Sequence, residues 1–158
     1  LRIKAEQGAS RVTRGRAAIL KAYLLEQLPK TKKEVLTVAL NEQSNERAYV
    51  LGRLFSLLEQ IQEAANPGIN TTISDRFFTS ACTTPLSVFP TLLRLSMAHI
   101  AKLEGGLPVS FERQKTAILG KLEVDEKPFP NQLDLQEQGL FILGYYHQTQ
   151  ARYTKKEG

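Results

Sequence analysis

Side chains able to do acid–base or nucleophilic chemistry are few in this sequence and lie far apart. The histidines, His99 and His147, have no second histidine or cysteine at metal-ligand spacing. The single cysteine, Cys82, has no basic neighbour within a helical turn to lower its thiol pKa. The acidic pair 125–126 has no partner histidine. The sequence also lacks the clustered carboxylates that a helical nuclease would need. We therefore expect structural histidines, an inert buried thiol, no metal or cofactor, and no enzymatic activity.

Positively charged side chains are the more informative group. Residues 1–33 carry nine basic and two acidic side chains, a net charge of +7, whereas the whole chain carries +5. This asymmetry favours contact with a polyanion, the alternative being an ordinary solvated surface. Cations on helix faces opposite the apolar stripes extend the set. The predicted phosphate-contacting residues are Arg14, Arg16, Lys21, Arg53, Arg76, Arg94, Lys102, Arg113, Lys115 and Lys121.

Tyrosines near the end of the chain offer a second kind of contact. Tyr145, Tyr146 and Tyr153 have rings on which unpaired bases can stack. We favour the interpretation that each tyrosine packs one ring face inward and keeps its hydroxyl near the surface. A protein interface is also open, because tyrosine and arginine are enriched at such interfaces.

Helical periodicity runs through almost the whole chain, and no strand pattern is convincing. Apolar residues recur every three or four positions over 14–28, 32–40, 45–65, 73–81, 84–103, 109–122 and 135–153. Ser44 is a suitable N-cap, Pro85 suits a first helical position, Pro90 predicts a bend, and Asp134 with Glu137 forms a capping-box pair.

We therefore predict an all-α multi-helix bundle of about six to seven helices. A single domain is expected over 14–156, after an extended or poorly ordered lead-in over 1–13, with a loop at 123–133. No apolar run is long enough to span a membrane, and the lone cysteine suits a reducing cytoplasm.

Four ordered motifs carry a family resemblance over about residues 14–156. The first motif covers residues 49–55 (YVLGRLF) and continues to 58–66 (LEQIQEAAN), and the second covers 73–81 (ISDRFFTSA) together with Pro85 and 88–90 (VFP). The third covers 92–95 (LLRL) together with His99 and 102–103, and the fourth covers 138–148 (QGLFILGYYHQ). Together they resemble the C-terminal region of the large subunit of subtype I-C CRISPR interference (Cascade) complexes. In that subtype the same region is also made separately as the small subunit. The chain begins at Leu1 and not at Met, which favours a C-terminal part of the large subunit, with the separate small subunit as the alternative.

The resemblance implies a non-catalytic, cytoplasmic helical bundle within a crRNA-guided surveillance complex used in antiviral defence. Its partners would be the backbone subunits, the crRNA–target DNA heteroduplex and the displaced non-target strand, with no membrane and no small-molecule substrate. Arg53, Arg76 and Arg94 lie within the matching motifs, and so does Lys102, which suggests non-specific phosphate contacts that stabilise the R-loop. Arg76 has a structural alternative, pairing with Asp75 or a helix end. The alternative function is a protein-interaction module that never touches DNA.

Overall fold

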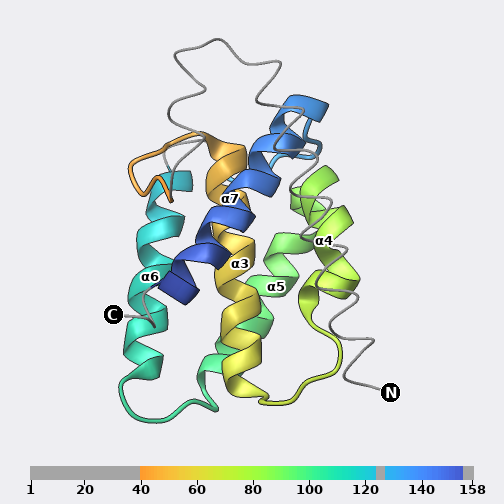
Figure 1. Cartoon of the computed structure of the whole chain (residues 1–158). Helices are drawn as coiled ribbons and strands as arrows, with labels where there is room; N and C mark the ends of the chain where they lie inside the picture. Colours follow the sequence, from red (N-terminus) through yellow and green to blue (C-terminus); the bar gives the residue numbers. More distant parts are fainter. Residues whose placement is uncertain (1–39, 124–126, 155–158) are drawn as a thin grey trace.

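A computed structural model describes residues 40–123 and 127–154 of the chain, and within them the protein is all-helical, with no strand. Five helices follow one another (Figure 1), and they are α3 (Arg47–Ala65), α4 (Ile73–Thr83), α5 (Pro85–Ile100), α6 (Leu107–Leu122) and α7 (Leu135–Thr154). The all-α prediction is confirmed. The lead-in over 1–13, the helices expected over 14–28 and most of 32–40, and Arg14, Arg16 and Lys21 lie outside the described residues.

The central element of the bundle is α3. Residues 48–59 are all buried, so this helix has no solvent-facing side along most of its length. The other four helices surround it, and its contact with α7 is the most extensive between described helices. Figure 1 shows α7 crossing α3, with α4 and α6 on opposite sides and α5 behind. Such a helix must be apolar or internally paired around its whole circumference.

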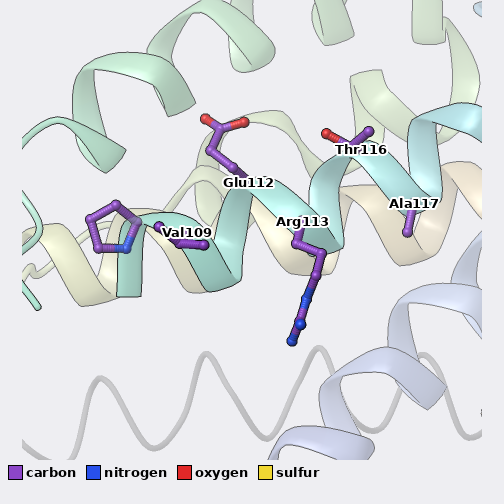
Figure 2. A pocket seen from close by; sticks show the side chains of 6 residues that line it. Val109, Glu112, Arg113, Thr116 and Ala117 are labelled. Atoms are coloured by element: carbon purple, nitrogen blue, oxygen red, sulfur yellow. The ribbon is translucent and has the colours of Figure 1, made fainter. Parts of the chain in front are cut away.

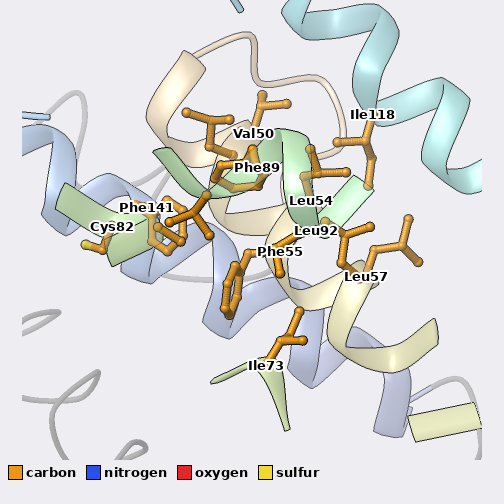
Figure 3. Packing of buried hydrophobic residues seen from close by; sticks show 14 of the residues in the cluster. Val50, Leu54, Phe55, Leu57, Ile73, Cys82, Phe89, Leu92, Ile118 and Phe141 are labelled. Atoms are coloured by element: carbon orange, nitrogen blue, oxygen red, sulfur yellow. The ribbon is translucent and has the colours of Figure 1, made fainter. Parts of the chain in front are cut away.

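An aromatic cluster fills the space around the middle of α3 (Figure 3). Phe55 is fully buried, and its ring centroid lies 5.6 Å from that of Phe78 and 5.9 Å from that of Phe141. Phe89 of α5 adds a ring 6.4 Å from Phe55 and stacks on Phe129 at 5.4 Å. Edge-to-face pairs at these separations add to the free energy of burying the rings. One cluster therefore joins α3, α4, α5 and α7.

Two glycines let α3 and α7 approach each other at backbone distance. A methyl group at Gly52 would overlap the carbonyl oxygen of Phe141 and stand 2.8 Å from the backbone nitrogen of Tyr145. A methyl group at Gly144 would overlap the carbonyl oxygen of Tyr49 in the same way. Glycine weakens a helix interior, so its presence at both positions reflects the close crossing and not local propensity.

Helix ends agree with the sequence to within a few residues. Pro85 is at the start of α5. At the start of α7, the Asp134 N–H donates to Glu137 Oε2 and the Glu137 N–H donates to Asp134 Oδ1, both at 2.8 Å, which confirms the predicted capping box. The N-cap of α3 is Glu46 and not Ser44, whose hydroxyl instead accepts the Glu46 N–H at 3.3 Å. The helix expected to reach Leu103 ends at Ile100 in a short turn. None of the described helices combines the length and apolarity that crossing a membrane requires.

Candidate nucleic-acid interface

Four of the predicted cations lie on the outer surface of the bundle. They are Arg76 on α4, Arg94 on α5, Lys102 just after α5, and Arg113 on α6, and all four are exposed. None forms an ion pair with a described acid. The pairing of Arg76 with Asp75 is not observed, since the Asp75 carboxylate instead accepts the Thr72 N–H at 2.9 Å and caps α4. Each of the four cations is available to an anionic partner.

These cations are spread out and not gathered into one pocket. Figure 1 places α4 and α6 on opposite sides of α3, so Arg76 and Arg113 are held by helices far apart in the bundle. The described residues as a whole carry ten basic and ten acidic side chains and are electrically neutral. Within them, residues 76–103 contain three basic residues and no acidic one. Asp75 and Glu104 flank this run directly, so residues 73–106 carry a net charge of +1, whereas α6 carries +2.

Arg53 corrects the sequence prediction, because it does not lie on a face turned away from the core. Only 5% of its surface is exposed, and its Nε donates to Gln148 Oε1 of α7 at 3.1 Å. Its Nη1 is buried with no hydrogen-bond partner. Burial lowers the pKa of this guanidinium, while Tyr49 and Glu42 act in the opposite direction. Arg53 therefore belongs to the α3–α7 contact, and we do not include it among the phosphate-contacting residues.

Lys115 is a second correction, and Lys121 is a partial one. Lys115 is 8% exposed, and its Nζ donates to Glu112 Oε1 at 2.8 Å, three residues earlier on α6. Lys121 is half-buried, and its Nζ lies 3.4 Å from Asn45 Oδ1 before α3. Lys115 is thus engaged within the chain, whereas Lys121 keeps part of its surface accessible.

A line of polar contacts joins α3 to α7 beside the apolar core. Glu59 of α3 is buried, and it accepts hydrogen bonds from Tyr145 Oη at 2.7 Å and from Thr72 Oγ1 at 2.7 Å. Desolvation raises the pKa of Glu59, although both hydrogen bonds act to lower it. One turn away, Ser56 Oγ lies 2.8 Å from Thr149 Oγ1. These groups bond to one another inside the protein, so we assign them to holding the two helices together.

The three tyrosines have different environments. Tyr145 packs its ring 5.0 Å from that of Phe78, and burial raises its pKa, as expected for a core residue with a bonded hydroxyl. The ring packs inward as predicted, whereas the hydroxyl, expected near the surface, is bonded inside the protein to Glu59 of α3. Tyr146 is half-buried, and Tyr153 is exposed near the end of α7, with the Arg152 guanidinium 5.9 Å above its ring. Tyr153 is the tyrosine among them whose ring remains accessible.

The histidines and the cysteine take structural positions. His147 is buried, with Nδ1 2.8 Å from Tyr49 Oη, and that hydroxyl also accepts the Asn41 N–H at 3.0 Å. His99 Nδ1 lies 3.3 Å from Asn66 Nδ2, and burial together with nearby Lys102 lowers the His99 pKa. Burial raises the pKa of the Cys82 thiol to about 12, as expected for an inert thiol.

The surface of α6 has one shallow, mostly apolar hollow (Figure 2). Among the described residues, those that line it all belong to α6, and they are Pro108, Val109, Glu112, Arg113, Thr116 and Ala117. In Figure 2 the Arg113 side chain points away from the side of the helix that carries Glu112 and Thr116.

Exposed apolar side chains on α5 and α6 differ from the solvated outer helix faces that the sequence predicts. Leu86 and Met97 on α5 are exposed, as are Leu107 and Val109 at the start of α6. The composition of α5 could have predicted this exposure, because the helix has no acidic residue and is apolar on more than one face. An apolar helix with an exposed side is typical of a surface that another molecule covers.

Chemically, the described part of the chain has the characteristics of a binding scaffold. It contains no group of three or more histidine, cysteine or acidic side chains placed to hold a metal ion. Its buried polar groups bond mainly to one another, and its unpaired cations point outward. These features define a helical bundle with exposed cations on its outer surface.

Comparison with known families agrees with this description. Residues 1–153 match the family described as CRISPR-associated protein (Cas_Csd1), and the chain belongs to that family. No curated protein matches the chain significantly. CRISPR association, predicted from the four motifs, is thereby confirmed.

Proposed function

We propose that the chain is a non-catalytic part of a subtype I-C crRNA-guided surveillance complex, where it docks on other subunits and contacts target DNA through phosphates. Family membership supports a role within a CRISPR-associated assembly. The observation that carries the DNA contact is that Arg76, Lys102 and Arg113 are exposed and pair with no described acid. Guanidinium and ammonium groups of this kind neutralise phosphates without reading sequence.

In such complexes, base pairing between guide and target supplies the sequence specificity. Replacing the DNA duplex with the RNA–DNA heteroduplex changes the free energy little, so a few phosphate contacts shift the equilibrium. Arg76 and Lys102 are the described residues we assign to this role, with Arg113 on the other side of the bundle. The strongly basic residues 1–33 would add to the same attraction.

A second function is favoured by a different observation, the electrical neutrality of the described bundle taken as a whole. A neutral helical domain with exposed leucine and methionine side chains suits a protein-interaction module that never touches DNA. The two functions differ in what neutralising the exposed cations would do. If the chain is a protein-interaction module, the assembled complex keeps its DNA affinity when those charges are removed.

The test uses the assembled complex carrying Arg76→Gln, Lys102→Gln and Arg113→Gln together. We expect binding of non-specific single- and double-stranded DNA to weaken about tenfold at physiological salt, because three phosphate contacts are lost. Size-exclusion chromatography checks that the complex still assembles. Unchanged DNA affinity in a fully assembled variant complex would favour the protein-interaction module.

A further inference from the structure

The outer face of α5 is mostly apolar, and its exposed polar residues are Ser87 near the start and Arg94 in the middle. Leu86 is 48% exposed, Leu95 is 39% exposed and Met97 is 66% exposed. Exposed positions recur at three- and four-residue steps along the helix, which places them on one stripe. The stripe consists of Leu86, Pro90, Arg94, Met97 and Ala101, with Leu95 and Ala98 beside it. From end to end it spans about 22 Å at the rise of an α-helix.

One charged group lies in the middle of this stripe. Arg94 has Pro90 one turn before it and Met97 one turn after it, so its aliphatic stem runs between apolar neighbours. No residue of α5 is acidic, and no described acid pairs with Arg94. A partner that covers the stripe must therefore supply an anion at this point, since an uncompensated buried charge is costly.

We propose that the outer face of α5 docks an amphipathic helix of another protein in the assembly, with an apolar stripe against α5 and a carboxylate opposite Arg94. This deepens the proposed function by stating the chemistry of a partner, and it rests on that function only in placing the chain within an assembly. Methionine, arginine and large apolar side chains are enriched in the buried centres of protein interfaces. A helix of about four turns matches the length of the stripe.

Nucleic acid and a second copy of this chain fit the surface less well. Phosphates would meet Arg94 in the middle of the stripe and Lys102 at one end, with apolar side chains between them, and burying those apolar side chains against a charged backbone gains little. A two-fold pairing of α5 with α5 would bring two Arg94 side chains toward the same interface, where like charges oppose association. An acidic, apolar helix satisfies both the apolar stripe and Arg94.

The first experiment places a photo-crosslinking amino acid at position 97 in the purified assembled complex. The matched control carries the same amino acid at position 109, which is also exposed and apolar but lies on α6. We expect position 97 to crosslink to one peptide of another subunit, with apolar residues at three- and four-residue spacing and an acidic residue among them. Crosslinking to nucleic acid or to another copy of this chain, or no crosslink at position 97, would overturn the proposal.

The second experiment reverses the charge at the centre of the stripe. We expect Arg94→Glu to reduce incorporation of the chain into the complex at least tenfold, and the charge reversal Lys127→Glu, at an exposed position before α7, to leave incorporation unchanged. Changing the acidic residue of the crosslinked helix to lysine should restore incorporation of Arg94→Glu to within about threefold of the original. Normal incorporation of Arg94→Glu, or failure of the lysine change to restore it, would contradict the proposed contact.

The two proposals fail in distinguishable ways. Loss of DNA affinity in the complex carrying Arg94→Glu, with incorporation unchanged, would make Arg94 a phosphate contact and overturn the docking proposal alone. Normal DNA affinity in the Arg76→Gln, Lys102→Gln and Arg113→Gln complex would overturn the DNA contact and leave the α5 docking face standing.

Discussion

Gly52 of α3 lies directly against the backbone carbonyl of Phe141 on α7, at a distance that leaves no room for a side chain. The relationship is reciprocated nearby, where Gly144 of α7 lies against the carbonyl of Tyr49 on α3. With backbone against backbone, the polar side chains on either side of the crossing can reach across, as Ser56 does to Thr149. The crossing therefore sets the position of the most extensive helix contact in the described bundle.

Replacing either crossing glycine with alanine should destabilise the protein. The added methyl group would meet rigid backbone atoms, so the two helices must separate, and we expect a loss of about 2–3 kcal/mol or more in the free energy of unfolding. Urea denaturation of Gly52→Ala and Gly144→Ala measures this. Gly120→Ala on α6 is the control, because nothing lies near its added methyl group, and it should raise stability by up to about 1 kcal/mol. Wild-type stability in both crossing variants would show that α3 and α7 do not meet at these glycines.

The Tyr49 hydroxyl should contribute to stability through two contacts at the start of α3. It accepts the Asn41 N–H at 3.0 Å and lies 2.8 Å from His147 Nδ1. We expect Tyr49→Phe to lower the free energy of unfolding by about 1–2 kcal/mol, because buried polar groups lose a partner. Thermal or urea unfolding gives the value, with Tyr153→Phe at the exposed end of α7 as the control. Equal stability of the two variants would mean that the Tyr49 contacts contribute nothing.

Glu59 should make stability depend on pH in a defined direction. Burial raises its pKa above the ordinary value of 4.5, so the native state holds this proton more tightly than the unfolded state does. Its contribution to the free energy of unfolding is fully present below the unfolded-state pKa and decreases as pH rises through the native-state value. We therefore expect Glu59→Gln to become more stable relative to wild type as pH rises above 4.5, the ordinary value of this carboxyl pKa.

Denaturant unfolding at several pH values measures the change in stability at Glu59. The exposed Glu123→Gln variant controls for the loss of one negative charge. A difference between Glu59→Gln and wild type that moves in the opposite direction with pH would contradict the burial of this carboxylate.

Cys82 should be unreactive while the protein is folded. Burial raises its pKa from 9.0 to about 12, which lowers the thiolate fraction about a thousandfold, and its Sγ also donates to the Gln138 carbonyl at 3.6 Å. Alkylation by iodoacetamide near neutral pH should be slower than that of a small free thiol by at least two orders of magnitude. The difference should disappear in denaturant. Rapid labelling of the native protein would show that the thiol is accessible.

The sequence predicts the helices well, because helical periodicity and capping chemistry are local. The Asp134–Glu137 box forms as expected, and the helix predicted over 45–65 is observed over Arg47–Ala65. Arg53 was misplaced for a physical reason. Its position relative to the apolar stripe suggests a solvated face, yet α3 is enclosed on every side, and its off-stripe residues contact other helices.

The close crossing of α3 and α7 also lies beyond what periodicity can show. Gly52 and Gly144 are visible in the sequence as glycines inside apolar helices, but their pairing depends on the tertiary arrangement. The same limit applies to Lys115, whose burial depends on how α6 packs against α3 and α5. Which cations are exposed depends on how the helices pack against one another, so helical periodicity alone does not predict the candidate interface.

The central claim, that exposed cations of this helical scaffold contact phosphates inside a larger complex, is tested most directly by the salt dependence of DNA binding. Arg76→Gln, Lys102→Gln and Arg113→Gln are each compared singly with Gln150→Glu, which changes net charge by the same amount at an exposed position of α7. For each cation that touches duplex phosphate, the slope of log affinity against log salt should become shallower by about 0.9. The control should leave the slope unchanged. Slopes identical to wild type for all three variants, in complexes that assemble normally, would contradict the account.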